Sequence, residues 1–319
     1  MRLTPISIII DDSTPLVHIH RELHKNDSVN RLGEPLKEKV PLGFLVDFCD
    51  LARDTGLRGK FSIIPMPGGL GDIVRGLCGF DQTEVELWLE AARTRLAPAF
   101  DFCPEILTHG KAIDLATGEL LSDNEEQWSL TQNRSTLAPY IAHALDLLRQ
   151  AGIIATGVTS PWFFGIKVEN DYAAAISDAF FSVLGKKDSW YFLHIKSDEA
   201  NVRPVVSFSE EDRRVVSIPA TTGDIFGDTL GSVRADDEWI NHMADHYLTA
   251  DGSSGVVLDA LERGSQPVIL THWQALFSNG RRTGLIALRM LAERINKHLS
   301  DRVVWTNFSD LMHQTLDGA

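Results

Sequence analysis

The run Ile6-Ser7-Ile8-Ile9-Ile10 is followed at once by two acids, Asp11 and Asp12. A short apolar run rich in β-branched residues is typical of a strand buried on both faces, as in parallel sheets covered by helices. We therefore expect an α/β fold. Strand packing gives no reason for two adjacent carboxylates, which repel each other unless one binds a cation or a proton. A simpler alternative is that Asp12 caps a turn with Ser13 and Thr14.

The rest of the chain alternates between strand-like and helix-like segments. Apolar runs predict strands at 60–65, 100–107, 153–158, 190–194, 214–219, 267–273 and 303–305. Helical spacing of apolar residues predicts helices at 43–52, 82–96, 136–150, 172–184, 239–248, 253–263, 284–299 and 308–316. This alternation, without a Pro/Ser-rich linker, predicts one domain over residues 1–319, a (β/α) barrel of seven or eight units. A doubly wound open sheet is the alternative, but Gly68-Gly69-Leu70-Gly71 is not the glycine-rich dinucleotide fingerprint.

Charge and composition narrow the classes of partner. The formal net charge of -14 argues against nucleic acid or an anionic membrane as the main partner. No apolar stretch has the length of a transmembrane helix, and the N-terminal run lacks the features of a signal peptide, so we expect a cytoplasmic protein. Cys49, Cys78 and Cys103 are scattered and odd in number, which predicts buried thiols rather than disulfides or a structural zinc site. The sequence gives no oligomeric state.

Three segments are expected to be excursions from the barrel, near 13–39, 111–133 and 195–250. The first is long for a plain connection, which is typical of a functional loop. It carries His18 and His20, of which at least one is expected to be a solvated surface residue.

Reactive or recognition side chains follow several of the predicted strands. They are Asp11 and Asp12, then His109, Trp162 and His272. In a parallel barrel the C-terminal strand ends share one face, so these side chains are expected to converge. Carboxylates and imidazoles suit Zn²⁺, with Fe²⁺, Co²⁺ or Ni²⁺ as alternatives, and a free carboxylate and a separate histidine can act as base and acid. The alternative is that His109 and His272 are ordinary core or loop histidines.

The order of these features resembles the polysaccharide deacetylase (NodB-like) superfamily. That family has a strand ending in Asp-Asp, an H-[ST]-x-x-H motif, an R-x-P-[YF] segment and a late L-x-H. Here the matching stretches are Ile9-Ile10-Asp11-Asp12, then 105–110 with His109, 159–165 with Trp162, Leu270-Thr271-His272, and a closing strand and turn at 305–311. The resemblance spans nearly the whole chain in order, through short motifs.

The resemblance implies a distorted (β/α) barrel of seven strands and specific roles. Asp11 would be the general base, Asp12 and His109 metal ligands, and His272 the general acid. Two departures matter: Ile113 stands where the family has its second metal-binding histidine, and the Arg of the third motif is missing. Either His18 or His20 supplies the missing ligand, or the metal has been lost.

Three functional hypotheses follow. The first is a metal-dependent hydrolase acting on a carbohydrate, with N- or O-deacetylation by a metal-bound water. Its substrate would be a small molecule or an oligosaccharide whose sugar faces stack on Trp162, Trp273 and Phe163, unless these aromatic residues belong to the core. The second is a metal-independent glycoside hydrolase of the same superfamily, using a carboxylate pair such as Asp11 and Asp224. The third is a non-catalytic carbohydrate-binding barrel.

Overall fold

A computed structural model describes residues 3–23, 29–30 and 32–318 of the chain. Its strands are β1 (Thr4–Asp11), β2 (Gly59–Ile63), β3 (Gly71–Asp72), β4 (Gly76–Leu77), β5 (Phe100–Pro104), β6 (Lys111–Ile113), β7 (Leu120–Asn124), β8 (Gly157–Thr159), β9 (Asp188–Phe192), β10 (Val205–Glu210), β11 (Arg213–Ser217), β12 (Val268–His272) and β13 (Val303–Trp305). Its α-helices are α1 (Ile19–Leu23), α2 (Leu42–Thr55), α3 (Gln82–Arg95), α4 (Glu125–Ser129), α5 (Arg134–Gln150), α6 (Glu169–Leu184), α7 (Gly227–Gly231), α8 (Asp237–Tyr247), α9 (Val256–Glu262), α10 (Trp273–Phe277), α11 (Thr283–His298) and α12 (Phe308–Asp317).

Strand β1 is the centre of a parallel sheet with the order β12-β1-β2-β5, and β13 pairs with the first half of β1. All residues of β1 from Ile6 to Asp11 are buried, as its unbroken apolar run predicts. The register places Asp11 opposite His272 on β12. On the other side, Gly59 of β2 approaches β1 so closely that an added Cβ would lie 1.8 Å from the carbonyl oxygen of Ile8, so only glycine fits there.

A second sheet has the order β10-β11-β9-β8, with β10 antiparallel and the other strands parallel. A parallel bridge between Glu105 and Thr159 joins it to the β5 side of the first sheet. Beyond β11, the backbone N–H of Thr221 donates to the carbonyl oxygen of Val268 on β12, at 2.9 Å. The parallel α/β prediction is confirmed, whereas the closed barrel of seven strands stays a prediction.

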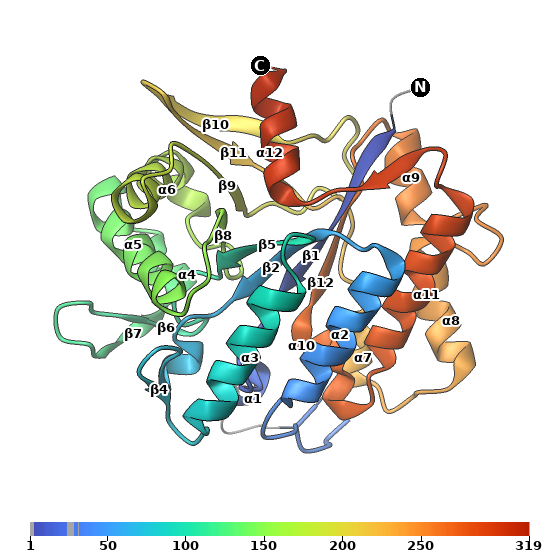
Figure 1. The fold of residues 1–319 in the computed structure, drawn as a ribbon, viewed down its shortest axis with the longest axis horizontal. Coiled ribbons are helices and arrows are strands. Elements are labelled where there is room, and N and C mark those ends of the chain that lie inside the picture. The colour runs from blue at the N-terminus through green and yellow to red at the C-terminus, as the bar shows by residue number, and fades with distance from the viewer. Residues whose placement is uncertain (1–2, 24–28, 31, 319) are drawn as a thin grey trace.

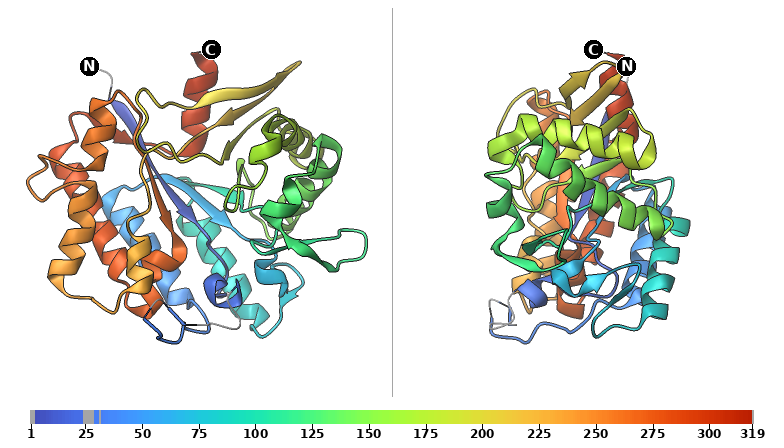
Figure 2. Two further views of the ribbon diagram at one scale, coloured as in Figure 1. Left: turned by 180° about the vertical axis from the view of Figure 1, so that it is seen from behind. Right: turned by 90° about the vertical axis from the view of Figure 1, so that its left-hand side faces the viewer.

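The helices cover this strand framework. Helices α2, α3 and α11 lie side by side next to β1 and β2, whereas α5 and α6 pack together near β8 and β9 (Figure 1). Seen from behind, the β10–β11 hairpin extends beyond the sheet close to α12 (Figure 2). None of the described helices is long and apolar enough to cross a membrane.

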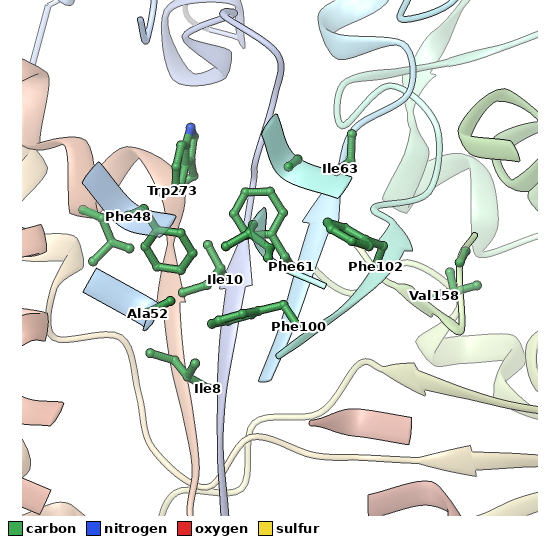
Figure 3. Packing of buried hydrophobic residues seen from close by; sticks show 14 of the residues in the cluster. Ile8, Ile10, Phe48, Ala52, Phe61, Ile63, Phe100, Phe102, Val158 and Trp273 are labelled. Carbon is green, nitrogen blue, oxygen red and sulfur yellow. The ribbon is translucent and has the colours of Figure 1, made fainter. Parts of the chain in front are cut away.

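The aromatic core lies between β1, β2 and α2, directly below the strand ends. Figure 3 shows Phe48 of α2, Phe61 of β2 and Trp273 packed together with Ile10 of β1. The Phe61 and Trp273 rings lie 5.3 Å apart between centroids, in an edge-to-face arrangement. Complete burial of one large apolar side chain contributes roughly 1.5–3 kcal/mol to folding. The framework that carries the strand ends is therefore well anchored.

Several details differ from the expectations. Strand β10 was not predicted, because its residues are half-exposed and polar in part. The 111–133 excursion is a β6–β7 hairpin followed by α4, and the 195–250 excursion holds β10, β11, α7 and α8. Cys49 and Cys103 are buried free thiols, but Cys78 is exposed, so its predicted burial is wrong. The first excursion includes residues 24–28 and 31, which lie outside the described part.

Candidate active site

A cavity of about 540 Å³ opens at the C-terminal ends of β1, β5 and β12. Its walls include Asp11, Asp12, His109, Trp162 and His272. These side chains were expected to converge because they follow predicted strands, and the structure brings them together. Their chemical roles stay predictions.

Three buried side chains form a candidate metal centre within this cavity. One ligand atom each from Asp12, Glu105 and His109 lies within 4.8 Å of the others. Asp12 Oδ1 is 2.7 Å from His109 Nε2, and Glu105 Oε1 is 3.3 Å from the same nitrogen. Asp12 Oδ1 is nevertheless buried without an aligned hydrogen-bond partner among the described residues. Such an orphaned acceptor beside an imidazole nitrogen is the arrangement that a shared cation would satisfy.

The backbone aims Asp12 and His109 at each other through unusual conformations. Both residues have left-handed φ angles, 60° at Asp12 and 50° at His109. Non-glycine residues in this region are strained, and they persist where the surrounding structure holds them in place. Two of the three side chains of the candidate metal centre therefore come from residues with a strained backbone.

A buried carboxylate, Glu125 of α4, holds the loop that carries His109. Its Oε2 accepts the backbone N–H of His109 at 2.8 Å, and its Oε1 accepts those of Thr108 and Leu107 at 2.9 and 3.2 Å. The Tyr140 hydroxyl also donates to Oε1, at 2.8 Å. Four donors on one carboxylate explain how the 107–109 loop keeps its shape.

Glu105 is fixed from the opposite side. The Ser62 hydroxyl and the backbone N–H of Asp12 both donate to its Oε2, at 2.6 and 2.7 Å. Its other oxygen, Oε1, is the atom directed at His109. Glu105 lies in the 105–110 stretch that resembles the family motif, but no role was predicted for it. Its signal was present, because it directly follows the buried strand β5.

The protonation of Asp12 and His109 is coupled. Burial alone would raise the pKa of Asp12, but the positive charge of His109 holds that pKa well below its usual range. Burial alone would lower the pKa of His109, but the charge of Asp12 raises it well above its usual value. Without a cation, the two side chains therefore form an ion pair.

Asp11 points to a different partner, Lys60 of β2. Lys60 is completely buried, and its Nζ donates to Asp11 Oδ1 and to Thr159 Oγ1, the latter at 2.5 Å. Burial raises the pKa of Asp11 to about 7, against the lowering effect of Lys60. Lys60 was predicted only as a strand residue, although a lysine within an apolar strand is a recognisable sequence signal, because lysine is almost never fully buried unless it is paired.

His272, at the end of β12, is held by Asp224. Its Nδ1 lies 2.7 Å from Asp224 Oδ2, and its ring forms part of the cavity wall. Burial favours the neutral ring, but the negative charges of Asp12 and Asp224 raise the pKa of His272 to about 10. His272 is therefore a protonated group facing the cavity at neutral pH.

The two loop histidines have different positions. His20 lines the cavity, and its Nε2 is 3.1 Å from Asp12 Oδ2, so it touches the candidate metal centre. His18 is completely buried beside the Phe277 ring, and neither of its nitrogens has a partner among the described residues. The structure does not place His18 with the candidate ligands, which corrects its prediction as one. Glu105, rather than His18, is the third side chain of the cluster.

The two tryptophans that were predicted to stack on sugars lie in different environments. Trp162 is 42% exposed at the cavity, and its ring lies 4.6 Å from that of His109, edge to face. Trp273 is completely buried and points into the core (Figure 3). Its ring lies 4.5 Å from that of Phe44, between centroids. A side chain with no exposed surface cannot stack on a substrate, so the prediction for Trp273 is wrong.

Comparisons with known proteins give little further guidance. No family model and no curated sequence matches this chain. Similar solved structures include a 4-α-glucanotransferase from Thermococcus litoralis (12% identity, TM-score 0.45, 97% of this chain and 40% of that one). A second is a GH57 branching enzyme from Thermococcus kodakaraensis (12% identity, TM-score 0.46, 98% of this chain and 71% of that one). A third is an exo-β-1,4-mannosidase from Opitutaceae bacterium strain TAV5 (10% identity, TM-score 0.43, 93% of this chain and 60% of that one). This chain spans about two fifths of the length of the glucanotransferase.

Proposed function

We propose that this protein is a divalent-metal-dependent hydrolase that removes an acyl group from a carbohydrate by N- or O-deacetylation. The observation that carries the proposal is the convergence of Asp12, Glu105 and His109 beside His272 in one cavity.

The residues present fit a divalent cation. Two carboxylates and one imidazole suit Zn²⁺, and also Fe²⁺, Co²⁺ or Ni²⁺. The orphaned Oδ1 of Asp12 and the directed Oε1 of Glu105 would gain a partner from an ion held with His109. His20, in contact with Asp12, is placed to orient that ligand or to join it. A cation at this place would polarise an acyl carbonyl and increase the acidity of water.

The remaining side chains supply proton transfer. Asp11 lies next to Asp12 at the end of β1, and its Oδ1 is held by Lys60, so it is positioned to accept a proton from the attacking water. His272 lies opposite Asp11 in the strand register, and Asp224 on its Nδ1 leaves Nε2 to donate a proton to the departing amine or alcohol. The proposed base, Asp11, and the proposed acid, His272, therefore lie on adjacent strands.

Aromatic surface at the cavity supports a carbohydrate as the substrate. Trp162 and Phe163 are 42% and 50% exposed, and both line the cavity. Exposed aromatic rings beside polar groups provide apolar faces for ligand binding within an otherwise polar site. We assign the sugar ring to this surface and the acyl group to the candidate metal centre.

The glycoside hydrolase alternative has weaker support. It needs Asp224 as a free carboxylate paired with Asp11, but Asp224 is hydrogen-bonded to His272 and lines a neighbouring cavity. Retained activity after chelation, together with release of shorter sugars, would favour that alternative over deacetylation.

The test combines metal analysis with activity. Protein purified and reconstituted with Zn²⁺ or Co²⁺ should hold one ion per chain by elemental analysis and should release acetate from acetylated amino sugars. Asp12→Ala and Glu105→Gln should lose both the ion and the activity, whereas Asp123→Ala, at an exposed position on β7, should lose neither. An ion-free wild type, or full activity in Asp12→Ala, would refute the proposal.

A further inference from the structure

Three apolar residues at the end of β9 form one wall of the candidate active site. Phe192, Leu193 and Ile195 all line the cavity of about 540 Å³ that contains the candidate metal centre. Their side chains carry no hydrogen-bonding group. The proposed function uses the carboxylates and histidines of this cavity for the reaction and Trp162 for the sugar ring, so it leaves this apolar wall without a role.

The apolar wall begins beside the proposed general base. The Nζ atom of Lys60 lies 5.2 Å from the centre of the Phe192 ring. Lys60 is also the residue that donates a hydrogen bond to Asp11. The Phe192 ring therefore adjoins the place where the acyl group would react.

From Phe192 the apolar wall leads outward to solvent. Phe192 and Leu193 are 5% and 2% exposed, whereas Ile195 is 49% exposed. Phe163, which is 50% exposed, lines the same cavity. The cavity therefore offers apolar surface from its base to its opening, and a ligand without polar groups would be needed to cover it without losing hydrogen bonds to water.

The backbone that carries the apolar wall is extended. The N–H of Ala220 donates to the carbonyl oxygen of His194, and Ile195 forms a parallel bridge with Ala220. Alternate side chains of an extended chain point to the same side, which agrees with Leu193 and Ile195 lining this cavity while His194 lines another. The chain from Phe192 to Ile195 spans up to about 10 Å, and a hydrocarbon chain of about eight carbons has a similar length.

We infer that the preferred acyl group of this protein is a medium-length hydrocarbon chain of about six to ten carbons, rather than acetyl. Its carbonyl lies at the candidate metal centre, and its chain runs over Phe192 and Leu193 towards Ile195. Hydrolysis breaks the bond between the acyl carbon and the sugar nitrogen or oxygen. The hydroxyl of water joins the acyl carbon and the proton goes to the departing amine or alcohol, so a fatty acid is released. This inference rests on the proposed function for the position of the carbonyl.

Binding of free carboxylic acids tests the chain preference without turnover, because these acids are products and are not consumed. The probes are acetate, butanoate, hexanoate and octanoate, measured by calorimetry on zinc-reconstituted protein. All four have the same carboxylate, so the ratio of octanoate to acetate affinity reports only on the chain. Each buried methylene should strengthen binding roughly three- to fourfold, so we expect a ratio of about 100 or more in wild type.

Two isoleucine variants locate the chain. Ile195→Ser removes the exposed end of the apolar wall and leaves the core intact, and it should lower the octanoate-to-acetate ratio about tenfold. The matched control is Ile154→Ser, at an isoleucine that is 52% exposed and does not line this cavity, and it should keep the wild-type ratio. A wild-type ratio near one, or the same ratio in the two variants, would overturn the inference.

Turnover separates this inference from the proposed function. N-octanoylglucosamine should be hydrolysed with a kcat/KM at least about ten times that of N-acetylglucosamine. Equal kcat/KM for the two sugars, with an ion bound, would overturn the chain preference and leave the hydrolase intact. Absence of acid release from both sugars, with no ion bound, would refute the hydrolase, and the binding ratio would still decide whether the apolar wall holds an acyl chain.

Discussion

Lys60 and Asp11 form a buried ion pair, with the two side chains 0% and 5% exposed. The pair lies between β1 and β2, immediately beside the candidate metal centre. A buried ion pair stabilises only while both partners are present, because removal of one leaves a charge without compensation. Loss of the pair should therefore affect both the stability of the sheet and Asp11, the proposed general base.

Lys60→Met should be strongly destabilising for this reason. We expect a loss of roughly 3–5 kcal/mol in the free energy of unfolding, measured by urea denaturation. The control is Lys39→Met, which removes an exposed ion pair with Glu84 and should cost about 1 kcal/mol or less. Similar effects of the two substitutions would contradict the buried pair.

Glu125→Gln tests whether the Glu125 carboxylate holds the 107–109 loop in place. The amide cannot accept all four donors as the carboxylate does, so His109 should lose its orientation. We expect about 10–100-fold weaker binding of Zn²⁺ or Co²⁺, by analogy with residues that orient metal ligands elsewhere. Glu126→Gln, one position along α4, should bind the ion as wild type does. Unchanged affinity of Glu125→Gln for the ion would show that the 107–109 loop keeps its shape without this carboxylate.

Asp224→Asn should alter the pH profile of activity. The charges of Asp12 and Asp224 raise the pKa of His272 above its usual value, and as an acid His272 works only while protonated. Activity should therefore fall as pH rises through this pKa, and in Asp224→Asn the fall should begin at lower pH. The profile of kcat/KM, together with NMR titration of the ring, measures the shift. Asp198→Asn, at an exposed position, is the control, and an unmoved alkaline limb would exclude His272 as the acid.

His18 should make the fold sensitive to acid. Burial, followed by the nearby charge of His20, lowers the pKa of His18 from 6.5 to about 4. Because the unfolded chain binds the proton first, stability should fall as pH drops from about 6.5 towards 4, by up to about 1.4 kcal/mol per pH unit. Urea denaturation at several pH values should show a smaller fall in His18→Phe than in wild type. The exposed His313→Phe should behave as wild type, and an equal response of both variants would contradict the assignment.

Trp162 and Trp273 should respond in opposite ways to truncation. Trp273→Ala removes a buried ring from the core and should cost about 3–5 kcal/mol of stability, measured by urea denaturation. Trp162→Ala removes a ring that is 42% exposed and should mainly weaken sugar binding in calorimetry. A stable Trp273→Ala with weakened sugar binding would reverse the two assignments.

The sequence was most informative about strand ends. Apolar runs locate β1, β5 and β12, and polar residues at or beyond the end of each run line the cavity, among them Asp12, His109 and His272. Burial imposes an apolar pattern on these strands, so polar side chains near the strand ends indicate where the chain leaves the core.

What the sequence could not supply depends on contacts between distant segments. Glu125 reaches the 107–109 loop only because the β6–β7 hairpin turns α4 back towards it. Trp273 adjoins His272, yet the chain turns into α10 there and directs its ring into the core. His18 and His20 differ by two positions in a segment expected to be a loop, and the start of α1 at Ile19 separates their environments. Local pattern carries no information on these orientations.

The three candidate ligands arise on either side of a strand that supplies none of them. Asp12 follows β1, Glu105 and His109 follow β5, and β2 lies between the two in the sheet. In the complete sheet β2 lies between β1 and β5, where Gly59 permits the close approach to Ile8. A cation at the proposed centre would therefore need the complete sheet in order to meet all three ligands. The presence of a bound ion would therefore indicate that the sheet is complete.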